Sequence, residues 1–323
     1  MERQITRQAI PRKMAPEITQ EPIQPIPSSN TSINNMNENS VYPVSSQTTF
    51  TTTTNKFNAL DNLEILPQIL QEGILFAGSG AALLLQAAFP GIRTTFDEAN
   101  SQKMPGTVSN LATSLSDTLQ AALSYIACLV FGTKEEKWRL LDLLQKDQPP
   151  LKYNLPSDPP TQLWITATVY TTATDFYQRI YGRVDFRTAE KAYAEFTTIL
   201  TCLNVAKDVW PPTRNAFWEY WDGQIERLNV TAESHRVAKD LLERKDFPGW
   251  VSAMRPLLRA ITVEMLPPQL RELYGLKSSA KTRGLYRGAM GLSVAVYPAL
   301  PASMRGYPLQ FYLKELRGQM GKP

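Results

Sequence analysis

The sequence predicts an all-α fold, a single large domain of about ten helices packed around one buried apolar helix. Apolar residues recur at intervals of three and four through nearly every segment after residue 57. Alternating apolar and polar runs, which would indicate strands, are almost absent. Hydrophobic residues make up 43% of the 323 residues and charged residues 20%, a balance typical of a globular protein with a sizeable core.

A polar arm, residues 1–57, precedes this domain, which spans 58–323. The arm is rich in Pro, Ser, Thr, Asn and Gln, and Glu38 is its single charged residue between Ser28 and Thr54. Because it offers few apolar groups to offset the entropy of chain ordering, we expect it to be disordered. It lacks the basic start and apolar core of a secretory signal, so we expect a cytoplasmic location.

The first expected helix covers 74–90 and is the central one. No charged residue occurs from Ile74 to Ile92, a length that could span a bilayer. The segment nevertheless contains Gln86 and Pro90, and we favour the central helix of a helical domain. Its glycines, Gly78 and Gly80, would let another backbone or a ligand approach closely.

The second expected helix covers 108–131, where the apolar positions form one stripe. Gly132 ends it, and Thr133 with Glu136 forms a capping box that opens the next helix, which runs to about Lys146. A proline-rich loop follows at 149–160. Further helices are expected at about 160–181, 188–205, 212–228, 231–245, 249–265, 267–275, 279–297 and 307–318.

Charge is unevenly distributed along the chain. The net charge is only +4, so bulk charge does not indicate a nucleic-acid partner. From Lys277 onward, however, Glu315 is the only acidic residue among many basic ones. Two interpretations stay open for these basic C-terminal helices. They could form a solvated basic face, or they could make peripheral contact with an anionic intracellular membrane.

Few residues are available for familiar catalytic chemistry. The single histidine, His235, lies in a charged helix and is expected at the surface, so neither a multi-histidine metal site nor a Ser/His/Asp triad is predicted. Cys128 and Cys202 lie in apolar stretches and are expected to be buried thiols. No Gly-rich phosphate loop follows a strand.

Several ordered motifs resemble the MpaB and latex-clearing (rubber) oxygenase family. The run from Glu72 to Gly91, EGILFAGSGAALLLQAAFPG, looks like its signature helix. Four more segments match in order: CLVFGTKEE at 128–136, LWITATVY at 163–170, FWEYWD at 217–222 and LPPQLRELYG at 266–275. The resemblance implies an all-α fold. It also implies haem b and O₂-dependent cleavage or oxidation of isoprenoid or meroterpenoid chains.

The chain departs from the family pattern where haem ligands are expected. The family's imidazole positions align with Phe89, Gln148 and Thr166, and its arginine and threonine fall near Thr118 and Ala122. Haem iron needs an axial His, Cys, Tyr or Met side chain. We therefore expect no cofactor and no metal. The alternative is haem b held by Cys128 or a tyrosine.

A haem-free member of the family would retain an apolar pocket with a few polar groups that orient the ligand. We expect Gln148 or Tyr125 to donate a hydrogen bond to a substrate carbonyl, and Asp175 to serve as an acid. The expected substrate-binding residues come from the first helix, the second helix and the helix after the proline-rich loop. They are Gln86, Phe89, Thr118, Ala122, Trp164, Thr166 and Tyr170.

Three functions remain as hypotheses. The first is a cofactor-independent cyclase or isomerase, for example of the Diels–Alder type, which shapes a hydrophobic polyketide or terpenoid in secondary metabolism. The second is a haem b-dependent oxygenase. The third is a non-catalytic protein that binds a lipophilic metabolite.

Overall fold

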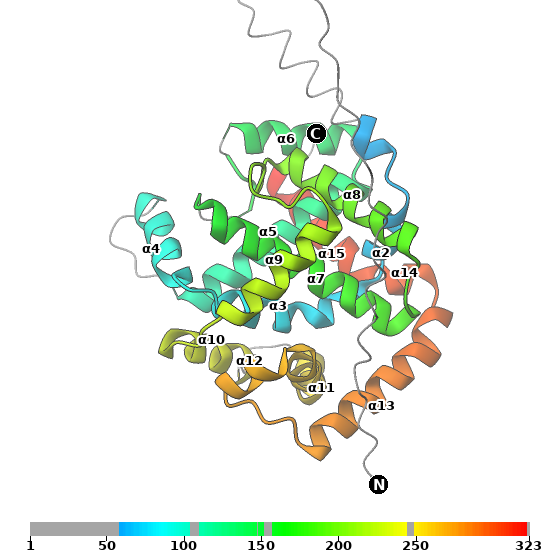
Figure 1. Cartoon of the computed structure of the whole chain (residues 1–323). Helices are drawn as coiled ribbons and strands as arrows, with labels where there is room; N and C mark the ends of the chain where they lie inside the picture. Colours follow the sequence, from blue (N-terminus) through cyan, green and yellow to red (C-terminus); the bar gives the residue numbers. More distant parts are fainter. Residues whose placement is uncertain (1–57, 104–109, 147, 152–156, 244–248, 322–323) are drawn as a thin grey trace, which may run out of the picture. The chain divides into compact units, whose positions relative to one another are not determined.

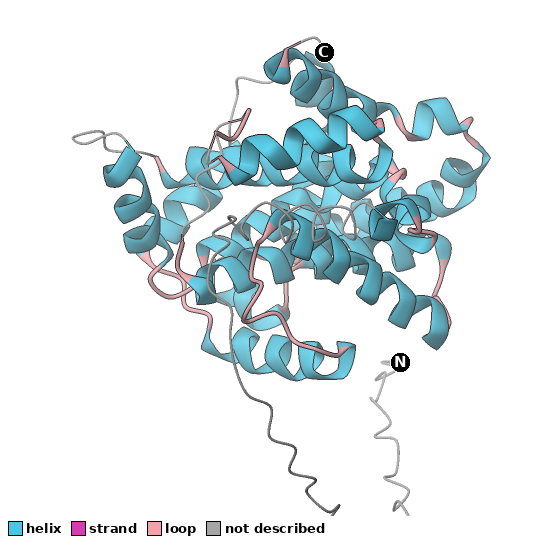
Figure 2. Cartoon of the chain, turned by 90° about the horizontal axis from the view of Figure 1, so that it is seen from above, coloured by secondary structure: helices cyan, strands magenta, loops and turns pink. Residues whose placement is uncertain are grey.

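All regular structure in the described part of the chain is helical (Figure 2). The computed structural model describes residues 58–103, 110–146, 148–151, 157–243 and 249–321. The polar arm lies outside these ranges, so its predicted disorder stays a prediction. The elements are α2 (Ile65–Leu70), η1 (Gly73–Gly78), α3 (Ser79–Ala87), α4 (Ile92–Lys103), α5 (Leu111–Phe131), α6 (Lys134–Gln145), α7 (Pro159–Tyr181), α8 (Phe186–Leu203), α9 (Arg214–Arg227), α10 (Ala232–Glu243), α11 (Gly249–Met265), α12 (Pro268–Leu273), α13 (Ala280–Val296), η2 (Tyr297–Ala299), α14 (Ala302–Arg305) and α15 (Tyr307–Met320).

The predicted helix boundaries at 132–133 are confirmed. Gly132 follows the last residue of α5, and its N–H donates to the carbonyl of Cys128 at 2.8 Å. The Thr133 hydroxyl then caps α6 by accepting from the Glu136 N–H, and the Glu136 carboxylate accepts from the Thr133 N–H, which completes the capping box. Each hydrogen bond satisfies a backbone N–H that would otherwise lack a partner at the helix start.

The core is centred on α3, whose residues from Ala81 to Ala87 are all buried. Helices α5, α7, α10 and α11 all contact α3. In Figure 1, α3 lies between α5 and α7 on one side and α10 to α12 on the other. The central apolar segment is therefore confirmed as the helix around which the domain packs.

The predicted continuous helix at 74–90 is wrong in its shape. Gly73–Gly78 forms a 3₁₀ helix, α3 ends at Ala87, and the chain then turns by 91° into α4, which the sequence did not predict. The turn passes through Gly91, whose φ of +78° favours glycine. Helix α4 escaped prediction because its sequence, IRTTFDEANSQK, is mainly polar.

The two glycines of the central segment are needed for close packing. A Cβ placed on Gly78 would lie 2.8 Å from Cγ2 of Thr172 on α7. A Cβ on Gly80 would overlap the hydroxyl of Thr262 on α11. At both positions a Cβ would come closer than normal van der Waals contact, so glycine lets α7 and α11 pack closely against the central segment.

One described helix, α5, is long and apolar enough to cross a membrane. Most of its apolar window, 61%, is buried against the rest of the protein. Leu111, Leu115 and Leu129 are among its fully buried side chains. This burial is what a core helix of a helical domain shows, and a core helix passes the same length and composition test.

Two buried carboxylates fasten segments that are distant in sequence. Glu195 of α8 accepts hydrogen bonds from the backbone N–H groups of Glu64, Ile65 and Leu66 at the start of α2, with distances of 2.7–3.1 Å. Glu72 pairs with Arg305, which also donates to the hydroxyl of Tyr181. These contacts hold α2 to α8, and the C-terminal segment to η1 and α7.

Candidate functional site: a stepped cavity between α3, α5 and α7

A cleft of about 610 Å³ opens between α5 and α10. Its floor is Ser79 and Leu83 of α3, together with Leu119 and Leu123 of α5. Asn110, Gln120, Lys239, Asp240, Glu243 and Tyr312 contribute polar groups. The volume lies within the range of about 300–1,000 Å³ that small-molecule sites occupy.

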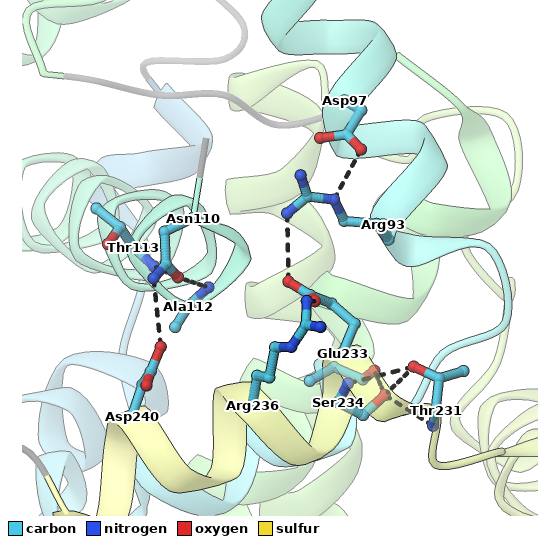
Figure 3. Close-up of polar contacts among 11 residues, drawn as sticks. Arg93, Asp97, Asn110, Ala112, Thr113, Thr231, Glu233, Ser234, Arg236 and Asp240 are labelled. Carbon is cyan, nitrogen blue, oxygen red and sulfur yellow. Dashed lines mark hydrogen bonds and ion pairs between the residues drawn. The ribbon is translucent and has the colours of Figure 1, made fainter. Parts of the chain in front are cut away.

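Two separate sets of polar contacts join α10 to neighbouring helices, one of them at the cleft (Figure 3). The side-chain oxygen of Asn110 caps α5 by accepting from the N–H of Ala112 at 2.8 Å, and its amide nitrogen donates to Asp240 of α10 at 3.2 Å. Further along α10, Arg93 of α4 lies between Asp97 at 2.7 Å and Glu233 at 3.3 Å. The contacts of Asp240 and Glu233 therefore link α10 to both α5 and α4.

A narrower apolar cavity of about 70 Å³ lies behind the cleft. Ser79, Leu119 and Leu123 line both spaces, so single side chains separate them. The rest of the lining is almost wholly apolar. It includes Leu66, Leu75, Phe76, Ala82, Ile126, Val169, Tyr170 and Phe196.

A third cavity, of about 30 Å³, lies between α5, α7 and α8. It shares Ile126, Val169 and Phe196 with the apolar cavity. Thr118, Ala122 and Thr166 also line it, so the structure brings together three residues that the sequence predicted for the site. Shared lining residues thus connect the three spaces in series, and we call this series the stepped cavity.

The hydroxyl of Thr118 is the unusual polar group of this inner cavity. Thr118 is 1% exposed, and its Oγ1 has no hydrogen-bond partner within the described part of the chain. Thr166, by contrast, donates its hydroxyl to the carbonyl of Gln162 at 2.7 Å. An unpaired buried hydroxyl costs about 1–3 kcal/mol and usually has a structural or functional explanation.

Gln86, Phe89 and Trp164 also come together, but they line none of these three cavities. Gln86 donates to the hydroxyl of Thr168 at 2.8 Å, and Trp164 donates to the carbonyl of Leu85 at 3.0 Å. The Trp164 ring stacks on Phe89 at 6.0 Å. These contacts join α3 and the residue after its end to α7, so the three side chains stabilise the packing of these two helices.

Two predicted tyrosines are buried. Tyr170 lines the apolar cavity within an aromatic cluster that includes Tyr193 and Phe217. The hydroxyl of Tyr125 accepts from the N–H of Leu151 at 3.3 Å and so fastens the segment after α6. Burial raises the pKa of each phenol to about 12. Both therefore stay neutral at physiological pH.

All three predicted catalytic residues, Tyr125 among them, lie outside the three cavities. Gln148 is exposed after the end of α6, where its backbone N–H donates to the carbonyl of Leu143 at 2.9 Å. The Asp175 side chain is 43% exposed and pairs with Arg179 at 2.8 Å. The chain leaves the core before Gln148, and Asp175 has its partner one helical turn away. Neither side chain therefore lines the cavities described above.

The residues that line the cavities do not fit a haem. No imidazole stands at Phe89, Gln148 or Thr166, and His235 is exposed on α10, as predicted. Both cysteines are buried, as predicted, and burial raises the pKa of Cys128 to about 12, which disfavours the thiolate that iron binds. Among the described lining residues, only the phenols of Tyr170 and Tyr312 are of axial-ligand type. Burial raises the pKa of both.

Sequence reasoning missed several residues that shape the site. Leu119 and Leu123 were recognised as part of a buried stripe but not as the partition between two cavities. Thr168 gave no signal, because its partner Gln86 lies 82 positions away. Asn110 carried a usable signal, since asparagine is favoured immediately before a helix.

Comparison with known proteins agrees with this architecture. A family model described as "ER-bound oxygenase mpaB/B'/Rubber oxygenase, catalytic domain" matches residues 66–295. Two similar proteins are the uncharacterized protein Mb2261 of Mycobacterium bovis and the uncharacterized protein Rv2237 of Mycobacterium tuberculosis. Each is 23% identical over 251 residues, which cover 73% of this chain and 94% of the relative. No solved structure matches. Because the family model covers more than half of the chain, the protein belongs to the family of MpaB and rubber oxygenase catalytic domains.

Proposed function

We propose that this protein is an enzyme that binds a lipophilic small molecule in the stepped cavity and rearranges it without haem. Membership of a family of oxygenases supports enzymatic activity. The observation that carries the proposal is the unpartnered Thr118 hydroxyl at the inner end of an apolar passage. A substrate oxygen placed there would give this hydroxyl the hydrogen bond that the protein does not supply.

The proposed reaction is a non-oxidative cyclisation or isomerisation, with a Diels–Alder reaction as the model. Such a step redistributes electron pairs within one molecule, so it needs no oxidant, reductant or metal. The apolar side chains that line the cavities, among them Leu119 and Phe196, would hold a flexible polyketide or terpenoid chain in a reactive conformation. Positioning alone can lower a barrier by roughly 7–11 kcal/mol in the best intramolecular cases.

Thr118 would add electrostatic stabilisation. A hydroxyl that donates to a carbonyl conjugated with the reacting bonds withdraws electrons as the transition state forms. Leu119 and Leu123 would yield as the substrate enters, because both side chains line the cleft as well as the apolar cavity. The cleft would hold the bulk of the substrate, and the narrow cavity would take its slender end.

A haem b-dependent oxygenase is the second candidate, since the family description names oxygenases. It requires a ligand other than imidazole, and the available phenols have raised pKa values. Non-catalytic binding of a lipophilic metabolite is the third candidate. It would use the same cavity without turnover.

Binding of a fluorescent apolar probe separates these possibilities. Purified protein should bind 1-anilinonaphthalene-8-sulfonate, and geranylgeraniol should displace it. Leu119→Trp and Ala122→Phe fill the passage and should weaken displacement. Ala194→Phe, at an exposed position on α8, is the matched control and should change nothing. Displacement that both cavity variants leave intact would place the site elsewhere.

An absorption spectrum and an anaerobic assay test the chemistry. Protein expressed with added haem precursor should show no stoichiometric band near about 400 nm, where haem proteins absorb. Such a band would restore the oxygenase. Linear polyenes should give products of unchanged mass under nitrogen. Binding with no conversion of any tested polyene would favour the carrier.

A further inference from the structure

Helix α13 presents an outer side that no other described element covers. None of its residues is buried. Its inner side packs Tyr286 and Met290 against the apolar cluster around Phe176 and Ile261. In Figure 1, α13 (orange) lies at the edge of the described helices.

The outer side carries apolar side chains in water. Leu285 is 41% exposed and Leu292 is 65% exposed. Val294 and Val296, at the end of the same helix, are 47% and 46% exposed. Lone exposed aliphatic residues are common, but several on one short helix indicate a surface that binds something.

Small residues make the outer side flat. Gly284, Gly288 and Gly291 lie on this side of the helix, and a Cβ added to any of them would meet nothing within 4 Å. At 3.6 residues per turn, Leu285, Gly288 and Leu292 fall on one stripe of the helix. A planar surface could therefore reach the helix backbone without meeting bulky side chains.

The same region is strongly basic. Lys277, Lys281, Arg283 and Arg287 are all exposed. The sequence has no acidic residue between Glu272 and Glu315. None of these four cations takes part in an ion pair within the ranges that the structure covers. Their charges are thus available to an external anion-rich partner.

We propose that the outer side of α13 docks on an anionic lipid bilayer. The helix would lie in the interface plane, with Leu285 and Leu292 entering the acyl boundary and the cations at the headgroup level. Anionic lipid attracts each cation near its surface. A second copy of this face would instead bring like charges together. The proposal is independent of the reaction proposed for the stepped cavity.

Flotation with vesicles tests this directly on the full chain. The protein should bind vesicles of palmitoyl-oleoyl phosphatidylcholine with 30% phosphatidylserine and should not bind phosphatidylcholine alone. Because surface charge is screened by salt, binding should fall sharply when KCl is raised from 0.1 to 0.5 M. Replacing Lys281, Arg283 and Arg287 together by glutamine should reduce partitioning roughly 100-fold.

A second variant tests insertion separately from charge. Leu285→Ser with Leu292→Ser should reduce partitioning by about tenfold or more, since both apolar side chains leave the interface. Controls on α8 are Arg187→Gln and Phe186→Ser, which change one exposed arginine and one exposed apolar side chain away from α13. Neither control should alter binding. All variants should keep the parent melting temperature, because every changed side chain is exposed or half-exposed.

Three outcomes would overturn the proposal. Equal binding with and without phosphatidylserine would refute a requirement for anionic lipid. Binding of the α13 variants that equals that of the parent would show that this face does not contact the membrane. A stable dimer in sedimentation that Gly288→Leu dissociates would assign the face to a second copy of the chain. None of these outcomes affects the stepped cavity, which the probe-displacement assay tests.

Discussion

Replacing Thr118 by valine should separate stability from function. The substitution keeps the shape of the side chain and removes only the hydroxyl, which is buried and unpartnered. An unpaired buried hydroxyl costs about 1–3 kcal/mol, so its removal should stabilise the ligand-free protein by up to that amount. For a domain of this size, the gain corresponds to a rise in melting temperature of about 2–10 °C.

The same change should weaken function. If a substrate oxygen binds the Thr118 hydroxyl, Thr118→Val removes that hydrogen bond and leaves the bound oxygen unpaired. Affinity for an oxygen-bearing apolar ligand such as geranylgeraniol should then fall roughly 10-fold, which corresponds to about 1.4 kcal/mol. The assays are calorimetric melting of the free protein and displacement of the fluorescent probe.

Thr168→Val is the matched control on α7. The Thr168 hydroxyl accepts from Gln86 at 2.8 Å and donates to the carbonyl of Ile165 at 2.6 Å. Its removal leaves the buried Gln86 amide unpaired and should lower stability by about 1–3 kcal/mol. If Thr118→Val destabilises the protein as much as Thr168→Val does, then the Thr118 hydroxyl has a partner and the argument for a ligand fails.

Three further outcomes are expected. Gly80→Ala should lower the melting temperature, because the added Cβ meets the Thr262 hydroxyl. Adding Thr262→Ala should restore most of the loss. A Gly80→Ala variant with an unchanged melting temperature would refute the close packing of α3 on α11. The urea midpoint should stay constant from pH 7 to 10 and fall as the pH rises toward 12. The pKa of Tyr125 is about 12 when folded against 10.0 when unfolded, so the unfolded phenol ionises first, and Tyr125→Phe should reduce the fall. Turnover should persist under nitrogen and vary little between pH 6 and 8, since the single histidine is exposed on α10; a rate that collapses without O₂ would reject the non-oxidative mechanism.

Much of the secondary structure was predictable because its determinants are local. The helix expected at 249–265 is α11, Gly249–Met265. Periodicity placed α7 and α15, and the box formed by Thr133 and Glu136 marked the start of α6 within a four-residue span. Family membership was predictable for the same reason, since it follows from ordered sequence motifs.

The break after α3 was not predictable from composition. An uncharged run from Ile74 to Ile92 is compatible with one long helix; Pro90 and Gly91 permit a turn at its end, but the course of the chain beyond it depends on packing against neighbouring helices. The polar helix α4 forms beyond that turn, where Arg93 pairs with Glu233 of α10. Local propensity carries no information about such a distant partner.

The candidate site, like the secondary structure, was predictable from the sequence only in part. The sequence by itself predicted that Thr118, Ala122 and Thr166 share one site, because helical spacing and the family motifs place them on facing helices, and the three residues line one cavity. Only the tertiary structure separated these residues from Gln148 and Asp175. It did so because packing decides which polar side chains face a cavity, and it leaves the side chains of Gln148 and Asp175 in contact with solvent. Asp175 has Arg179, Gln148 has solvent, and Thr118 has neither.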